Sequence, residues 1–315
     1  MLLTGFLEFD DELVCLSEVL GKTLMVKIGS VNATMAFPRL SEKSFKNSEN
    51  NYEFFPPLDA PLGAEKWEQG GRPLYWGRPI SFPEISVEIA RIAFFIECSE
   101  SNVKSVAHDL YNDMPRWKEA FIHYCELTNN SYPRKSLDVD TKNCGFDLYS
   151  DKHIESDFID SVTIYVDSSS KNISLSQIKD ACTFASSGKD LHIEYEMIIE
   201  TYHAIEKKQY KLAIIDACSA LEICLDRKIT DYCLQINFDP EILLSKYRLL
   251  SDKVTLIRKF YPGFSSISGI KEKIIVIRNN VAHSRTISPT DKETNDLLKK
   301  VEDCLQFFYN DFYEL

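Results

Sequence analysis

The chain has 315 residues, of which 44% are hydrophobic and 27% are charged, a composition typical of a soluble globular protein with two ordinary domains. Its formal net charge of -12 excludes indiscriminate binding to phosphate backbones or anionic membranes, because both require a basic surface. A nucleic-acid function would therefore have to rest on a local basic patch. No segment reaches the roughly 18 uninterrupted apolar residues of a membrane span, so we expect no membrane partner.

The N-terminal sequence and the cysteines both indicate a cytoplasmic protein. The stretch "MLLTGFLEFDDELV" has no positive region before its apolar run, which breaks at Glu8, so it does not resemble a signal peptide. The nine cysteines form no C-x-x-C pair, and their odd number without disulfide or metal spacing indicates reduced thiols. We therefore expect neither a metal nor another cofactor.

The first half of the chain is predicted to be rich in β-strands. Short, partly alternating segments with branched or aromatic residues predict strands over 2–9, 23–29, 31–37, a pair within 85–98, and one over 161–168. Helices are predicted over 116–127 and 175–185. The long stretch 38–83 is rich in prolines and aromatic residues, and two interpretations remain open: it covers a face of the sheet, or it forms a recognition loop.

From Leu191 onward the pattern is almost purely helical. Apolar residues recur at three- and four-residue spacing over 191–209, 209–229, 240–250, 253–261, 270–283 and 294–315. Ser288 or Thr290 is the expected cap of the last helix. The predicted fold class is therefore α+β multidomain, with a β-rich or mixed N-terminal domain over 1–175 and an all-α helical bundle over 176–315.

One polar cluster interrupts the penultimate helix, in the sequence "IVIRNNVAHSRTI". Asn279 and His283 are four residues apart and share a helix face, whereas five residues rotate Arg278 about 140° away from His283. For all three to meet at one phosphate, the long side chain of Arg278 must reach around the helix, or the helix must loosen near Val281.

These residue types suit metal-independent RNA cleavage, in which the ribose 2′-hydroxyl attacks its own phosphodiester. Histidine exchanges protons near neutral pH, arginine grips phosphate oxygens, and asparagine can orient an imidazole. One chain supplies a single histidine, so a two-fold dimer would have to provide both base and acid. The alternative is structural, because an arginine and a histidine at a helix end often cap its carbonyls.

The segment 190–315 resembles a HEPN domain, an all-helical family of ribonucleases and RNA-binding modules. The resemblance rests on Arg278-Asn279 followed by His283 near the end of a late helix, and on the upstream helix "KKQYKLAIIDACSALEICL". It implies a homodimer whose two motifs share one cleft, with Arg278, Asn279 and His283 as catalytic residues. It also implies that Glu222, or less favourably Asp216, supports the site.

Within this family the helix is similar to the ApeA-like group of bacterial antiphage proteins. That resemblance implies abortive infection by RNA cleavage, with an N-terminal domain that senses a phage-derived trigger and restrains the nuclease. RNA, such as tRNA or another single-stranded loop, would contact Lys271, Lys273 and Arg285. Further cations lie on or beside the early helices: Lys207, Lys208, Lys211, Arg227 and Lys228. The alternatives are a non-catalytic HEPN module that binds RNA or protein, and a purely structural helix cap.

Overall fold

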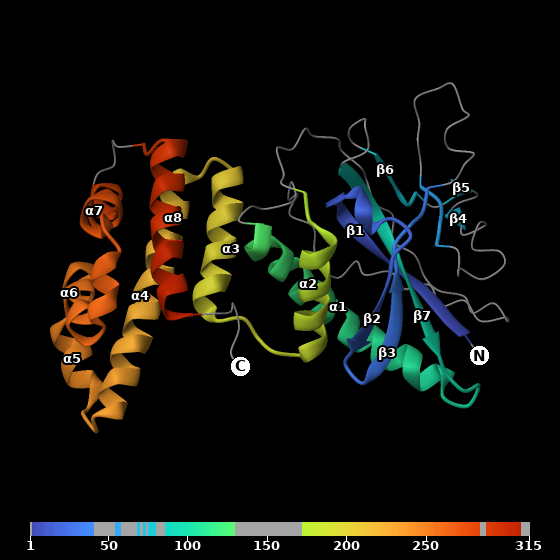
Figure 1. Cartoon of the computed structure of the whole chain (residues 1–315), viewed down its shortest axis with the longest axis horizontal. Helices are drawn as coiled ribbons and strands as arrows, with labels where there is room; N and C mark the ends of the chain where they lie inside the picture. The colour runs from blue at the N-terminus through green and yellow to red at the C-terminus, as the bar shows by residue number, and fades with distance from the viewer. Residues whose placement is uncertain are drawn as a thin grey trace. The chain divides into compact units, whose positions relative to one another are not determined.

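The computed structural model describes residues 2–40, 54–57, 68–69, 72–73, 75–79, 86–129, 172–283 and 288–309. The chain divides into two compact units, Met1–Lys189 and Asp190–Leu315 (Figure 1). The first contains an antiparallel β-sheet and the second is helical, which confirms the α+β multidomain class. The boundary lies later than residue 175, because helix α2 (Leu175–Ser187) packs on the first unit rather than on the bundle.

The sheet of the first unit has the strand order β1-β7-β3-β2, with β6 paired to β7. Its strands are β1 (Leu2–Leu16), β2 (Thr23–Ile28), β3 (Val31–Ala36), β6 (Gly77–Pro79) and β7 (Ser86–Glu97). Two short strands, β4 (Glu68–Gln69) and β5 (Arg72–Pro73), pair separately. The pair predicted within 85–98 is wrong, because β7 is one strand without a turn signal and pairs with β1, β3 and β6.

Two helices cover one face of this sheet, α1 (Val103–Asn129) and α2 (Figure 1). The Trp117 ring meets Phe94 of β7 edge-on at 5.8 Å and stacks on Phe121 at 5.4 Å. Helix α1 begins well before the predicted 116–127 and continues through Pro115. Proline disfavours a helix interior, but the buried Met114 and Trp117 hold both sides of it against the sheet.

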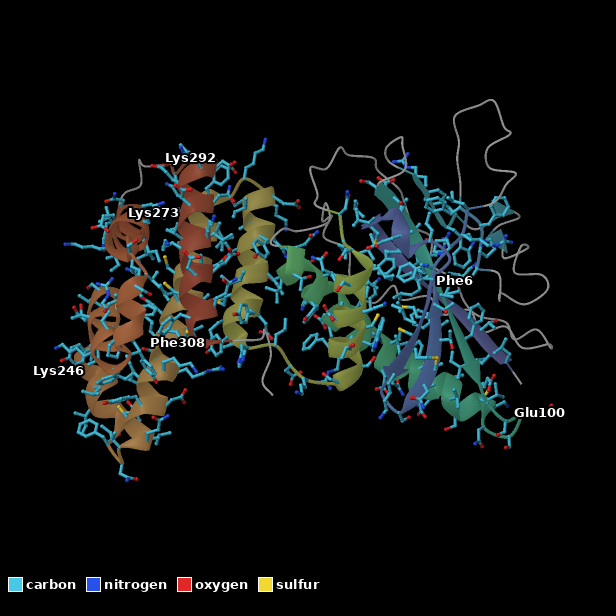
Figure 2. The ribbon with its side chains drawn as sticks, viewed as in Figure 1. Phe6, Glu100, Lys246, Lys273, Lys292 and Phe308 are labelled. Atoms are coloured by element: carbon cyan, nitrogen blue, oxygen red, sulfur yellow. The ribbon has the colours of Figure 1, made fainter. Side chains whose placement is uncertain are left out.

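Aromatic residues from the proline-rich stretch cover the other face of the sheet. Trp76 is 2% exposed and its ring meets Phe6 of β1 edge-on at 6.3 Å; Phe6 is labelled in Figure 2. Phe54 is also buried. The buried Arg91 of β7 donates to the Tyr75 carbonyl and pairs with Glu8. Phe54 and Trp76 therefore cover the sheet, whereas β6 joins it as a strand. Most of the remainder of 38–83, and the predicted strand over 161–168, lie outside the described residues.

The helical unit is organised around one central helix, α4 (Tyr210–Gln235), which contacts α3, α5, α6, α7 and α8. These are α3 (Ile193–Glu206), α5 (Pro240–Lys246), α6 (Leu250–Phe260), α7 (Val276–His283) and α8 (Asp291–Phe308). Many of its buried residues are small, namely Ala213, Ala217, Cys218, Ala220 and Cys224. Small side chains let the neighbouring helices approach α4 on several sides, and this makes α4 the core of the unit.

Aromatic packing and a cap fix the last helix. A 3₁₀ turn at Pro262–Ser266 brings Phe264 onto Phe308, with the rings stacked at 5.3 Å; Phe308 is labelled in Figure 2. Thr290 accepts from the Glu293 amide, while Glu293 accepts from the Thr290 amide and hydroxyl. These hydrogen bonds lower the pKa of Glu293. Of the two expected caps, the structure selects Thr290.

Candidate functional site

The helix that carries the Arg278 and His283 motif starts with a widened turn. Residues Lys271–Ile275 form a single π turn, and the Val276 amide donates to the Lys271 carbonyl five residues earlier. From Val276 to His283 the helix is a regular α-helix. The widened turn therefore lies before the motif. The helix does not loosen near Val281, which was one of the two ways for Arg278 and His283 to meet. π turns of this kind are frequent at functional sites.

One face of α7 is open to solvent. Val276, Asn279, Asn280 and His283 are all exposed and follow the i, i+3, i+4, i+7 spacing of a single helix face. Val281 points the other way and is buried. Among the described residues none forms a hydrogen bond or an ion pair with the His283 imidazole. Its ring is therefore accessible to a ligand or to a second protein chain.

Arg278 leaves this face and turns toward the central helix. Its Nη2 atom lies 3.7 Å from Oε1 of Glu222 on α4, and both side chains are about one-third exposed, at 36% and 29%. Its Nη1 atom lies 3.5 Å from Oδ1 of the neighbouring Asn279. The structure thus brings three of the predicted site residues together. His283 lies about 140° around the helix axis from Arg278, as the spacing implies.

Cys218 lies beneath the Arg278–Glu222 pair and does not act as a nucleophile. The thiol is 2% exposed, and burial raises its pKa to about 12. Arg278 lowers this pKa and Glu222 raises it, so both charges act on the thiol. A thiol with such a pKa remains protonated at neutral pH, and Cys218 serves as a small packing residue under the site.

Asp216, the second candidate for the acidic residue, lies elsewhere. Six residues separate it from Glu222, which places the two side chains about 120° apart around α4. The pKa of Asp216 is raised first by partial burial and then by the charge of Glu200 on α3. Asp216 therefore faces α3, and the carboxylate beside Arg278 is that of Glu222.

The predicted basic patch is smaller than the sequence suggests. Lys271 and Lys273 are exposed on the π turn, and Lys273 pairs with Asp296 of α8 at 3.5 Å. Figure 2 labels Lys273. Arg285 lies outside the described residues. Arg227 and Lys228 on α4 contact Glu194 and the Tyr309 ring respectively, so these two cations belong to a different cluster.

That cluster surrounds a buried carboxylate which the sequence did not single out. Glu194 of α3 is fully buried; its Oε1 atom accepts from the Tyr309 hydroxyl at 2.8 Å and lies 3.4 Å from Nε of Arg227. The His192 ring lies tilted against the Tyr309 ring, with the ring centres 4.3 Å apart, and it hydrogen-bonds Arg227 at 2.9 Å. Burial first, and then the neighbouring Cys224 and Glu194, raise the pKa of Tyr309. Glu194 and Tyr309 lie 115 residues apart, and no local pattern could have paired them.

No protein-family model, curated protein or solved structure matches this chain. The helices of the described ranges include none that is long and apolar enough to cross a bilayer. The eight described cysteines are all free thiols. Within the same ranges no group of three or more His, Cys, Asp or Glu side chains is arranged to hold a metal ion.

Proposed function

We propose that this protein is a metal-independent endoribonuclease whose site lies on α7 and α4 of the helical unit. Arg278 binds the phosphate and stabilises charge on the phosphorane, and His283 transfers protons. Asn279 orients the imidazole or holds a phosphate oxygen, and Lys271, Lys273 and Arg285 contact the RNA. Glu222 acts as a positioning residue for Arg278. The proposal extends the resemblance to HEPN domains and to the ApeA-like antiphage group.

The Glu222–Arg278 ion pair is the observation that carries this proposal. The resemblance implies an acidic group on an early helix directed at the motif, and α4 supplies it at 3.7 Å. An arginine placed only to cap α7 would instead approach the last carbonyls of that helix. A guanidinium held by one carboxylate keeps other N–H donors available for a phosphate.

The chemistry requires a general base and a general acid, and in this proposal two histidines supply them. One imidazole removes the proton of the ribose 2′-hydroxyl, whose oxygen then forms a bond to the adjacent phosphorus. The second imidazole protonates the departing 5′-oxygen as the old P–O bond breaks. The products are a 2′,3′-cyclic phosphate and a 5′-hydroxyl. Arg278 stabilises the negative charge of the phosphorane that forms before the old bond breaks.

A homodimer supplies the second histidine. Three large apolar side chains are about half exposed on the first two turns of α4 and on α7: Leu212 at 46%, Ile215 at 47% and Val276 at 45%. Exposed apolar residues beside a functional site favour a protein interface. A two-fold axis next to α7 would place both His283 rings on one RNA strand.

The role in the cell follows from the same proposal. A ribonuclease of this kind is toxic when unrestrained, so the N-terminal unit keeps it latent until a phage-derived trigger arrives. Cleavage of tRNA or another single-stranded loop then stops growth of the infected cell. The net charge of -12 is compatible with this role, because an acidic surface repels RNA everywhere except at the basic residues around the site.

Replacing Ile215 with aspartate tests the dimer. We expect the mass measured by light scattering to fall from twice 36.2 kDa to 36.2 kDa and cleavage to be lost with it. The matched control is Leu234→Asp, because Leu234 is 62% exposed at the far end of the same helix. It should leave mass and cleavage unchanged. A wild-type monomer that cleaves RNA would refute the shared site.

A charge swap between Glu222 and Arg278 separates stability from catalysis. Arg278→Glu places two carboxylates side by side and should lower the free energy of unfolding by up to about 1 kcal/mol, since the pair is partly exposed. Adding Glu222→Arg should restore that stability, because the pair re-forms with reversed polarity. RNA cleavage should stay lost, because the guanidinium is now on α4. Cleavage restored together with stability would show that the pair is only structural.

A further inference from the structure

One edge of the N-terminal sheet has backbone groups that no described residue pairs. Strand β2 lies at the end of the order β1-β7-β3-β2 and pairs with β3 alone. The Phe37 amide donates to the Lys22 carbonyl, so the hydrogen-bonded pairs of this hairpin are those of Lys22, Leu24, Val26 and Ile28. The amides and carbonyls of Thr23, Met25 and Lys27 therefore point away from β3, toward the open edge.

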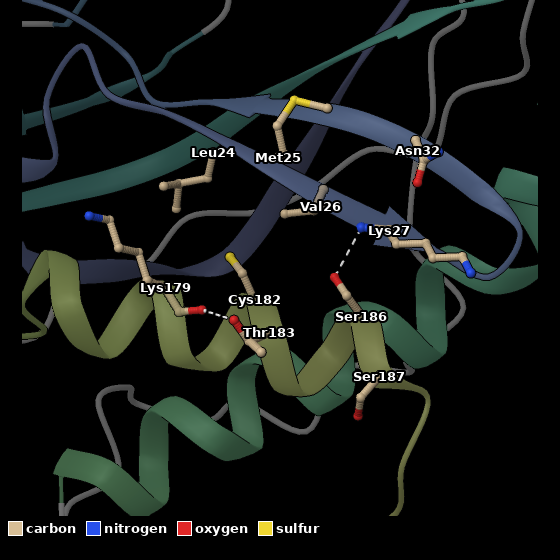
Figure 3. Close-up of a pocket in the computed structure, with 10 residues that line it drawn as sticks. All are labelled: Leu24, Met25, Val26, Lys27, Asn32, Lys179, Cys182, Thr183, Ser186 and Ser187. Atoms are coloured by element: carbon tan, nitrogen blue, oxygen red, sulfur yellow. Dashed lines mark hydrogen bonds between the residues drawn. The ribbon is translucent and has the colours of Figure 1, made fainter.

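Helix α2 closes this edge at one end only. The outward amide of Lys27 donates to the Ser186 hydroxyl of α2 at 3.0 Å, as Figure 3 shows. The same hydroxyl accepts from the Trp117 indole at 3.4 Å, which anchors the contact. Within the described ranges no group bonds the outward amide or carbonyl of Met25. A side chain thus replaces a neighbouring strand at Lys27, while the positions before it stay open.

A groove runs between the open edge and the helix. It has a volume of about 500 Å³, with Leu24 and Val26 on the strand side and Cys182 and Thr183 on the helix side (Figure 3). Leu24 and Val26 point toward α2, whereas Met25 points to the opposite face and is 74% exposed. An extended peptide beside β2 would direct alternate side chains into the groove and to solvent, as the strand itself does.

The charge of the groove specifies the occupant. Lys27 and Lys179 line it, and none of the described residues that line it is acidic. This positive lining is unusual in a chain with a net charge of -12. A second copy of the same edge would bring the same lysines against each other, which disfavours self-pairing. A strand with carboxylates would instead place opposite charges together.

We propose that the β2–α2 groove binds an extended acidic peptide segment of another protein, which adds to the sheet as a further strand beside β2. Main-chain hydrogen bonds to Met25 and Thr23 give affinity without regard to sequence, and the two lysines select carboxylates. The groove lies wholly within the N-terminal unit, so peptide binding there can be tested independently of RNA cleavage.

The probe is a library of ten-residue peptides, with Val, Ile or Thr at alternate positions and random residues between, selected on the full-length protein. We expect the enriched peptides to carry Asp or Glu. Their affinity, measured by fluorescence anisotropy, should fall at least about tenfold in Met25→Pro, which removes an outward amide that an edge strand does not need for folding. Hydrogen exchange of the Met25 amide in the wild type should slow when the peptide binds.

Charge variants complete the test. Lys27→Glu combined with Lys179→Glu should weaken the acidic peptides at least about tenfold, whereas Lys104→Glu, an exposed lysine on α1 outside the groove, should leave them unchanged. Selection of basic peptides, or of none, would overturn the proposal. So would unchanged exchange at Met25, or an oligomer that dissociates in Met25→Pro, because the edge would then be occupied by a second copy.

Discussion

Replacing His283 with alanine should lower RNA cleavage by about two to four orders of magnitude, the usual contribution of a positioned proton-transfer group. The substitution should leave the fold intact, because the imidazole is exposed at the last residue of α7 and no described residue pairs with it. The measurement is single-turnover cleavage of a labelled RNA in the presence of EDTA. The chelator inactivates any contaminating nuclease that depends on a metal ion.

The matched control is Glu272→Ala. Glu272 is exposed on the π turn that leads into α7, so its loss changes the surface charge near the site without removing a proposed catalytic group. It should cleave RNA as the wild type does. Equal cleavage by wild type and His283→Ala would exclude the catalytic role. RNA binding without cleavage in the wild type would favour the non-catalytic module instead.

The largest effect on stability is expected from Arg227→Met in the cluster around Glu194. Glu194 is fully buried, and its Oε2 atom has no hydrogen-bond partner among the described residues. Removing the guanidinium would leave a buried carboxylate without its cation. Such a loss typically costs about 3 kcal/mol or more. Urea unfolding of the full chain, followed by circular dichroism of the helical transition, measures it.

Two comparisons separate this effect from general damage. Arg258→Met, an exposed arginine on α6, should cost under about 0.5 kcal/mol. The double variant Arg227→Met with Glu194→Leu should recover part of the loss, because no buried charge then remains unpaired. A cost for Arg227→Met as small as that of the control would mean that the Arg227–Glu194 pair does not stabilise the folded protein.

Much of the helical unit could be predicted from the sequence, because its signals are local. The apolar spacing over 209–229 predicts α4, and the polar cluster in 275–287 marks the end of α7. The contact between Glu222 and Arg278 was also expected, from the resemblance of the helix that carries Glu222. The 140° between Arg278 and His283 follows from helix geometry alone. A motif within one helix turn keeps its geometry wherever that helix packs.

The sheet unit was less predictable, because packing overrides local preference there. Strand β7 is continuous since it is paired on both sides and buried on both faces, and such strands lack the alternation that marks a half-buried one. Pro115 suggests a helix break, yet α1 passes through it because Met114 and Trp117 are held in the core. Helix α2 has a bundle-like sequence and nevertheless packs on the sheet unit.

The sequence by itself determined the helices and strands whose hydrophobic pattern repeats within about ten or twenty residues. It also determined the motif that α7 carries. Only the tertiary structure decided which side chains far apart in the chain meet: Glu194 with Tyr309, Lys27 with Ser186, and Trp76 with Phe6. The physical reason is that the hydrogen bonds of a helix join residues four apart in the sequence, so a local pattern specifies them. A buried charge or an unpaired strand edge is bonded by residues far away in the sequence, and these come close only when the chain has packed.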